Sequence, residues 1–144
     1  MTTDKRIENA IKWIDALKPE VGFRKTTDRL GRIEEQGKMS YCCLGVACRT
    51  MEYTLVDFSA PTNHDLTEDL GLHDAEGLLE RFIDDNGNVE KPTTSYSRLS
   101  MINDKVFKDD TDFKNIREFI LKNIRFIFVR PVADELQIHY TSNE

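Results

Sequence analysis

Long hydrophobic runs, proline and glycine are all scarce in this chain, and each shortage excludes a class of protein. No apolar run approaches the roughly 18 residues that cross a membrane, so we expect no membrane-spanning segment. The first 18 residues mix charged and apolar side chains, unlike the apolar core of a signal peptide. Four prolines and seven glycines among 144 residues are too few for a disordered, low-complexity chain. We therefore expect a folded protein that stays in the cytoplasm.

Cysteine is scarce as well, and its three copies lie together in the apolar segment 41–48. Cys42 and Cys43 are neighbours and are poorly placed to bond to each other, and an odd number leaves at least one thiol free. Reduced thiols agree with a reducing compartment. The cysteines and the three scattered histidines match no spacing of a zinc site, so we expect no metal and no cofactor.

The thiols have a structural and a catalytic interpretation. Cys43 lies at the start of a predicted helix, where the helix dipole can lower the pKa of a thiol and favour a nucleophile. The sequence offers no identifiable base for it, and free cysteine is among the most buried residue types. We therefore favour core packing. The predicted core residues are Trp13, Cys42, Cys43, Leu44 and Cys48.

The net charge of −6 is concentrated in the middle of the chain. Residues 54–112 carry 14 acidic and five basic side chains, whereas residues 1–53 carry a small positive excess. So acidic a segment repels a phosphate backbone, which disfavours direct binding of nucleic acid. Mimicry of nucleic acid is an alternative, but short separate clusters such as Asp84-Asp85 are typical of a solvated surface.

Hydrophobic periodicity predicts the elements of the first half of the chain. The expected elements are a helix over 4–18, extended pieces over 23–27, 29–35 and 38–42, a helix over 43–51, a strand over 54–58, a loop over 59–64 and a short helix over 65–70. Thr2 or Thr3 can cap the first helix, and Pro19 follows its last turn as a stop. Gln36-Gly37 supplies a tight reversal, so a hairpin leads into the cysteine helix.

The second half of the chain predicts a second hairpin and further helices. The expected elements are a strand over 77–83, a turn over 84–88, a return strand near Val89, a short helix from Ser95 or Ser97 through Ile102, a longer helix from 109–111 to 124, an extended segment over 126–129 and a final strand over 132–140. Asn103-Asp104 is suited to closing the short helix. Residues 141–144 are expected to fray. The sequence thus predicts a single α+β domain over 1–144, with its core over about 4–130 and antiparallel hairpins packed against three or four helices.

Positive charge on the first hairpin is the best ligand-binding hypothesis. Arg24, Arg29 and Arg32 are accompanied by Lys25 and Lys38, and guanidinium groups suit bidentate contacts to the phosphate of a nucleotide. A mixed, solvated ribbon is the alternative, because acidic residues are interspersed. Further candidates for ligand binding are Tyr41, Asn103 and Asp104, although the Asn-Asp pair also fits a helix cap and turn. No catalytic residue is identified.

Several motifs follow one another in a recognisable order. They are Trp13 in the first helix, Cys42-Cys43-Leu44-Gly45-Val46 with Cys48, Leu70-Gly71-Leu72, and Leu99-Ser100-Met101-Ile102-Asn103-Asp104 followed by Phe113 and Ile116. This order resembles a widespread family of small phage and prophage accessory proteins, over about residues 5–124. The hairpin around Asn86-Gly87 and the extension beyond Asn123 depart from the shorter members. The resemblance implies expression in the cytoplasm of an infected bacterium and carries over no catalytic residue.

These observations lead to one functional hypothesis and two alternatives. The leading hypothesis is a non-enzymatic phage accessory protein that binds and inhibits or sequesters a host component, either a host protein or a small nucleotide-like ligand. The first alternative is an enzyme acting on a nucleotide-like substrate, and the second is an acidic mimic of nucleic acid. A homo-oligomer is compatible with each.

Overall fold

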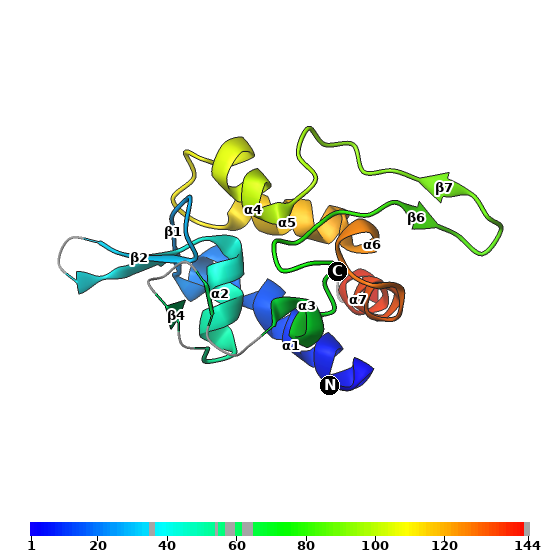
Figure 1. Ribbon diagram of the computed structural model, residues 1–144, viewed down its shortest axis with the longest axis horizontal. Coiled ribbons are helices and arrows are strands. Elements are labelled where there is room, and N and C mark those ends of the chain that lie inside the picture. Colours follow the sequence, from blue (N-terminus) through cyan, green and yellow to red (C-terminus); the bar gives the residue numbers. More distant parts are fainter. Residues whose placement is uncertain (35–36, 54, 57–59, 62–64, 143–144) are drawn as a thin grey trace.

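The computed structural model describes residues 1–34, 37–53, 55–56, 60–61 and 65–142. The α-helices in these ranges are α1 (Thr3–Ala16), α2 (Cys43–Thr50), α3 (Leu66–Leu70), α4 (Leu99–Met101), α5 (Lys114–Lys122), α6 (Ile124–Ile127) and α7 (Arg130–Ser142), with the 3₁₀-helix η1 (Pro19–Val21) and the π-helix η3 (Ile102–Val106). The strands are β1 (Arg24–Lys25), β2 (Gly31–Ile33), β3 (Met39–Tyr41), β4 (Leu55–Val56), β5 (Ala60–Pro61), β6 (Phe82–Ile83) and β7 (Val89–Glu90). The helices form the body, and the β2–β3 and β6–β7 hairpins project at its two ends (Figure 1). The predicted α+β fold is confirmed.

The first helix forms where its sequence pattern predicts. The Thr2 side chain accepts the backbone N–H of Lys5, which caps an otherwise unpaired donor at the helix start. Its inner face is fully buried and consists of Ala10, Trp13, Ile14 and the following Leu17. The indole N–H of Trp13 donates to the carbonyl of Cys43 at 2.8 Å, and its ring meets Phe128 edge-on at 6.1 Å between centroids. Trp13 thus ties α1 to both α2 and the end of α6.

The three-stranded sheet combines the expected hairpin with a third strand, β1, which lies within the extended piece predicted over 23–27 but pairs in a way that was not predicted. Strands β2 and β3 pair antiparallel, as predicted. Strand β1 pairs parallel with the other side of β3, so the strand order is β1-β3-β2. Between β1 and β2 the chain passes Asp28, whose φ of 69° lies in the left-handed region that Asp tolerates better than most residues.

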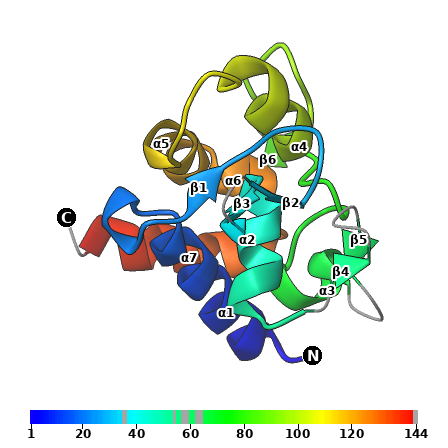
Figure 2. The same ribbon diagram turned by 90° about the vertical axis from the view of Figure 1, so that its left-hand side faces the viewer.

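The cysteine helix α2 lies in the middle of the molecule (Figure 2). Its N-cap is Cys42, whose sulfur accepts the backbone N–H of Gly45 at 3.3 Å. A Cβ atom at Gly45 would lie 1.7 Å from the carbonyl oxygen of Leu30, so only glycine fits where this loop crosses the helix. The predicted helix over 43–51 is confirmed, with Cys43 to Cys48 buried.

The core lies where α1, α2, α5, α6 and α7 meet. Its largest fully buried side chains are Trp13, Phe113, Phe128, Ile14, Leu17, Leu44, Leu70, Leu72, Leu99, Ile102, Ile116 and Ile120. This set includes side chains from both halves of the chain, so the two halves share one core. Among the described residues, no helix has the length and apolarity that would span a bilayer.

The prediction for the C-terminal segment is wrong for most of its length. Residues 126–127 and 132–140 were expected to be extended, but they lie in helices α6 and α7. Phe128 is extended as predicted and forms a bridge with Leu72, and Val129 lies between the two helices. Val132, Ala133 and Leu136 are buried at helical spacing, and Pro131 occupies the first turn, where its missing N–H is not needed. Residues 141–142 belong to the last turn of α7, whereas 143–144 lie outside the described residues.

Two predictions in the middle of the chain also need correction. The strand over 77–83 is confined to β6, because the Asp74 carboxylate accepts the N–H groups of Glu76 and Leu78 at 2.9 Å and turns the chain beforehand. The second hairpin, β6–β7, is confirmed. Strand β5 lies in the predicted loop over 59–64 and pairs with β4, while 54, 57–59 and 62–64 lie outside the described residues.

The short helix before Asn103-Asp104 and the longer helix after it have other boundaries than those predicted. The short helix begins at Leu99 and continues into η3, so Asn103-Asp104 does not close it. The longer helix begins at Lys114, whose N–H is accepted by the Asp112 side chain at 3.0 Å, rather than at 109–111.

Candidate functional site

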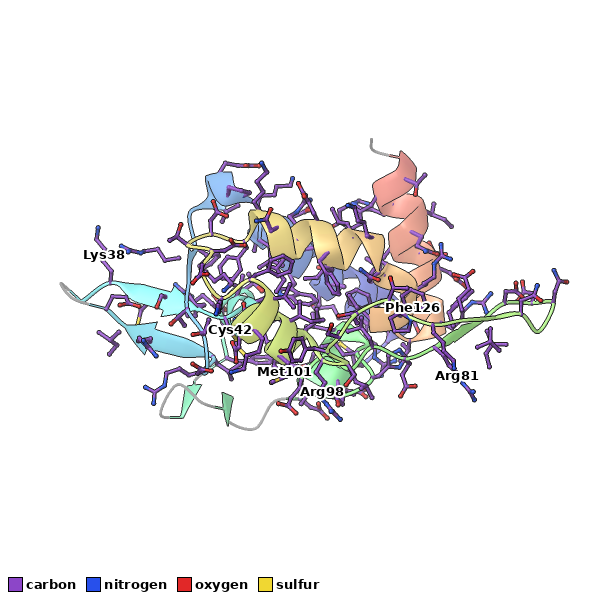
Figure 3. All side chains as sticks on the ribbon, turned by 90° about the horizontal axis from the view of Figure 1, so that it is seen from above. Lys38, Cys42, Arg81, Arg98, Met101 and Phe126 are labelled. Carbon is purple, nitrogen blue, oxygen red and sulfur yellow. The ribbon has the colours of Figure 1, made fainter. Side chains whose placement is uncertain are left out.

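The sheet brings two of the three predicted arginines together. Arg24 and Arg32 stand on either side of Ser40 in the register of β1, β3 and β2, so their side chains share one face. Two strand spacings separate their Cα atoms by about 10 Å. Lys38, two residues from Ser40, belongs to the same face and projects from this end of the molecule (Figure 3). Arg29 is exposed in the segment before β2 and lies outside this row.

Tyr41 belongs to the opposite face of the sheet. Only 8% of its surface is exposed, and its ring meets Phe23 edge-on at 5.6 Å between centroids. The structure therefore places Tyr41 in the core and apart from the predicted arginines.

Asn103 is fully buried, and its amide group is completely engaged. Its side-chain oxygen accepts the N–H of Cys43 at 3.2 Å. Its side-chain nitrogen donates to the carbonyl of Thr26 at 3.0 Å and to the carboxylate of Asp104 at 2.9 Å. A buried amide with these partners stabilises the fold and has no donor left for a ligand.

Lys25 of strand β1 also contributes hydrogen bonds to this buried network. Its ammonium group donates to the carbonyl of Asn103 at 3.0 Å and to that of Phe107 at 2.6 Å, which holds both ends of η3. Burial lowers the pKa of Lys25. This lysine therefore belongs to the support of the π-helix rather than to an exposed basic surface.

The pKa values of the three thiols disfavour the thiolate form that a nucleophile needs. Burial raises the pKa of Cys42 to about 11 and that of Cys48 to about 12. Burial raises the pKa of Cys43 well above its usual value as well, so the expected effect of the helix dipole is outweighed. The structure buries all three thiols among core side chains. Within the described residues, no group of three His, Cys, Asp or Glu side chains could hold a metal ion.

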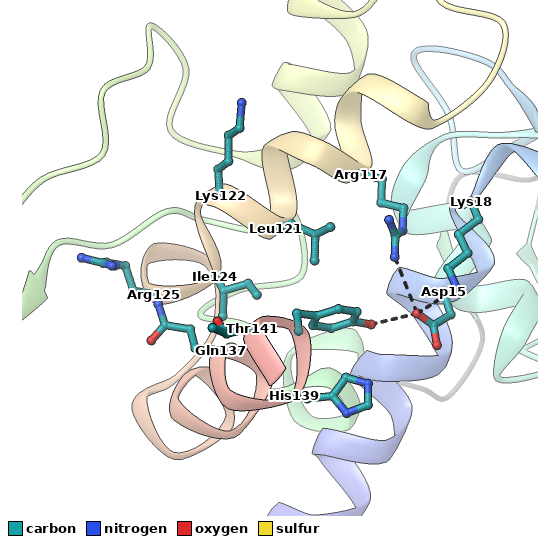
Figure 4. Close-up of a pocket in the computed structure, with 11 residues that line it drawn as sticks. Asp15, Lys18, Arg117, Leu121, Lys122, Ile124, Arg125, Gln137, His139 and Thr141 are labelled. Carbon is teal, nitrogen blue, oxygen red and sulfur yellow. Dashed lines mark hydrogen bonds and ion pairs between the residues drawn. The ribbon is translucent and has the colours of Figure 1, made fainter. Parts of the chain in front are cut away.

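A pocket of about 690 Å³ lies between the end of α1, the α5–α6 segment and the end of α7 (Figure 4). We call it the clasp pocket. Its lining residues are Asp15, Lys18, Arg117, Leu121, Lys122, Ile124, Arg125, Gln137, His139, Tyr140 and Thr141. Four of these described residues are Lys or Arg and one is an acid, so together they carry net positive charge in a chain whose net charge is −6.

One end of the clasp pocket is organised around Asp15. The hydroxyl of Tyr140 donates to Oδ1 of Asp15 at 3.0 Å, and Arg117 and Lys18 approach the same oxygen at 3.8 and 4.0 Å. The Nε of Arg117 donates to the carbonyl of Ile14 at 3.0 Å, which fixes the guanidinium. Burial and the adjacent Asp15 carboxylate raise the pKa of Tyr140, so its hydroxyl keeps its proton.

The other end of the pocket is cationic. Arg125 pairs with Glu90 of β7 at 2.6 Å, and Lys122 forms no ion pair with any described residue. Leu121 and Ile124 lie between the two ends and supply apolar surface (Figure 4). The arrangement offers a small ligand a positive end, an apolar middle and a carboxylate.

Sequence analysis missed the clasp pocket because its three parts are distant along the chain. They converge only when the segment from Gln137 to Thr141 is helical, and that segment was expected to be a strand. The available signal was the pair of basic residues Lys122 and Arg125, which are three residues apart at the end of the predicted long helix.

Comparison of the chain with models of protein families, with curated proteins and with solved structures finds no match.

Proposed function

We propose that this protein binds a small phosphorylated, nucleotide-like ligand in the clasp pocket and sequesters it without chemical change. The observation that carries the proposal is the concentration of Lys18, Arg117, Lys122 and Arg125 around one cavity of an acidic chain. Cationic side chains around a partly enclosed cavity attract and hold phosphate groups. Because the sequence resembles phage accessory proteins, we propose that the ligand is a nucleotide signal of the infected bacterium.

The pocket has a size and a lining suited to a small organic anion. Its volume of about 690 Å³ lies within the usual range of small-molecule sites. Lys122 supplies an ammonium group with three donors, and Leu121 with Ile124 can pack against a sugar or a base. The hairpin row of Arg24 and Arg32 is an open sheet face, which holds a small ligand less well than a cavity does.

Two groups of the pocket, Tyr140 and Asp15, are better suited to binding than to catalysis. A general acid or base works best with a pKa near the operating pH, whereas the pKa of Tyr140 is raised. The Asp15 carboxylate already accepts the Tyr140 hydroxyl and faces Arg117. These contacts support a role in shaping the pocket.

Mimicry of nucleic acid is less well supported, because cations neutralise parts of the acidic middle segment. Glu68 pairs with Arg6, and Glu90 pairs with Arg125. Asp85 pairs with Arg130 at 3.1 Å. Carboxylates paired in this way do not present the continuous negative charge of a phosphate backbone.

Calorimetric titration of the full chain with ribose 5-phosphate and nucleoside monophosphates at low salt tests the proposal. We expect saturable binding that weakens as salt screens the cations. Lys122→Gln should weaken it about tenfold, since one charge-assisted hydrogen bond is lost. Lys114→Gln is the matched control, because Lys114 is exposed on the same helix outside the pocket. Absence of binding by the wild-type chain would refute the proposal.

A further inference from the structure

Among the described residues, Asp15 supplies the one carboxylate in the lining of the clasp pocket. The hydrogen bond from Tyr140 and the shortest approaches of Arg117 and Lys18 all reach its Oδ1 atom (Figure 4). An ionised carboxylate has about four acceptor positions on its two oxygens, and the only hydrogen bond given to this carboxylate by the described residues, from Tyr140, occupies one of them. A ligand that enters the pocket meets an acceptor there as well as cations.

We infer that Asp15 selects nucleotides whose base presents two adjacent N–H donors, as guanine does. This inference rests on the proposed function, because it assumes that the phosphate binds at the cationic end. Guanine places its ring N–H beside its amino group, and a carboxylate can accept both. Adenine places a ring acceptor beside its amino group, so its ring nitrogen would face the carboxylate oxygen and be repelled.

The positions of the two ends agree with one nucleotide lying along the pocket. Arg117 and Lys122 are five residues apart on α5, which corresponds to about 8 Å along the helix. The apolar side chains of Leu121 and Ile124 lie between these ends, where a sugar and a base edge can pack. Phosphate at Lys122 and Arg125 then leaves the base near Asp15. Tyr140 and Arg117 hold the carboxylate in place, so it is oriented before the ligand arrives.

Competitive titration of the wild-type chain with GMP, IMP and AMP tests the inference without a mutation. IMP keeps the ring N–H of guanine and lacks the amino group. We expect GMP to bind between about fivefold and 100-fold tighter than AMP, with IMP between them. Equal affinities for the three nucleotides, or a preference for AMP, would overturn the role of Asp15. The proposal that the pocket binds phosphate would still hold in that case. If none of the three nucleotides and no ribose 5-phosphate binds, the proposed function fails and the inference fails with it.

Two matched variants test whether Asp15 causes the preference for GMP over AMP. Asp15→Asn replaces an acceptor oxygen with a donor and should reduce the preference for GMP over AMP to less than about twofold. Asp134→Asn makes the same chemical change on α7 outside the pocket and should leave the preference as it is. Thermal unfolding of both variants checks that each is folded. Retention of the full preference by a folded Asp15→Asn variant would contradict the inference.

Discussion

The backbone N–H of Cys43 donates to the side-chain oxygen of Asn103, 60 residues further along the chain, at 3.2 Å. The carbonyl of the same Cys43 accepts the indole N–H of Trp13. One residue of the cysteine block therefore joins the first helix to the Asn-Asp motif through its two backbone polar groups. The motifs that stand out in the sequence meet in one buried network, and their shared role there is structural.

Removal of the Asn103 amide should destabilise the protein strongly. Asn103→Ala leaves the N–H of Cys43 and the carbonyl of Thr26 buried without partners, and we expect a loss of about 2–4 kcal/mol in the free energy of unfolding. Urea unfolding followed by Trp13 fluorescence measures it. Asn115→Ala, at an exposed position, should cost less than about 0.5 kcal/mol. Similar losses for the two variants would show that the network is not a main source of stability.

Gly45 should tolerate no side chain. In Gly45→Ala the new methyl group would lie 1.7 Å from the carbonyl oxygen of Leu30, so the loop must move away from α2. We expect a loss of more than about 3 kcal/mol or failure to fold. Gly87→Ala is the control, since it adds a methyl group to open space in a left-handed turn and should cost about 1 kcal/mol. The prediction is wrong if Gly45→Ala is the milder change in urea unfolding.

The buried thiols should make the protein less stable in alkaline solution. The pKa of a cysteine thiol is about 9.0 when unperturbed, and it rises to about 11 for Cys42 and about 12 for Cys48 in the folded chain. Stability contributed by protonated thiols is therefore complete below pH 9 and is lost as the pH rises towards 11–12. Each thiol changes the free energy of unfolding by up to about 1.4 kcal/mol per pH unit in that range.

Urea unfolding at pH 8, 9 and 10 measures this dependence. Cys48→Ala should reduce the slope above pH 9, because one titrating group is absent. A thiol reagent at pH 8 should label the native protein only as fast as it unfolds. Rapid labelling without unfolding would show that at least one thiol is accessible.

The Tyr140–Asp15 contact should couple the two residues energetically. Tyr140→Phe removes the hydroxyl that donates to Asp15 at 3.0 Å, and we expect a loss of about 1–2 kcal/mol. With Asp15→Asn, a double-mutant cycle should give a coupling of about 1 kcal/mol in urea unfolding. Tyr96→Phe is the control, because the Tyr96 hydroxyl bonds to no described residue. Because Asn keeps an acceptor oxygen, additive effects of Tyr140→Phe and Asp15→Asn would show that the negative charge of Asp15 does not strengthen this hydrogen bond.

Local pattern was sufficient for the elements whose signals are local. The first helix has a cap, a single buried stripe and a proline after its end, and the cysteine helix has four apolar positions at helical spacing. The two hairpins follow from their turn residues. In each case the side chains that determine the secondary structure lie within the element itself.

The elements that sequence reasoning missed depend on distant contacts. Helix α7 contains Val132, Ile138 and Tyr140, which favour strands by propensity, yet it packs on α1 with helical spacing. The π-helix η3 is stabilised by hydrogen bonds from Lys25 and from the buried side chain of Asn103. These contacts join distant parts of the chain, so the local sequence pattern does not predict them. The clasp pocket depends on α7, so the error in one element concealed the site.

The edge contact between Trp13 and Phe128 has a consequence for synthesis on the ribosome. The first helix leaves the ribosome early, but the ring that covers its tryptophan is made roughly 115 residues later, which takes on the order of 6 to 23 s at typical bacterial and eukaryotic rates. During that interval the apolar face of α1 lacks its native cover and is open to chaperones. Trp13 fluorescence would therefore report the moment at which a nascent chain completes its fold.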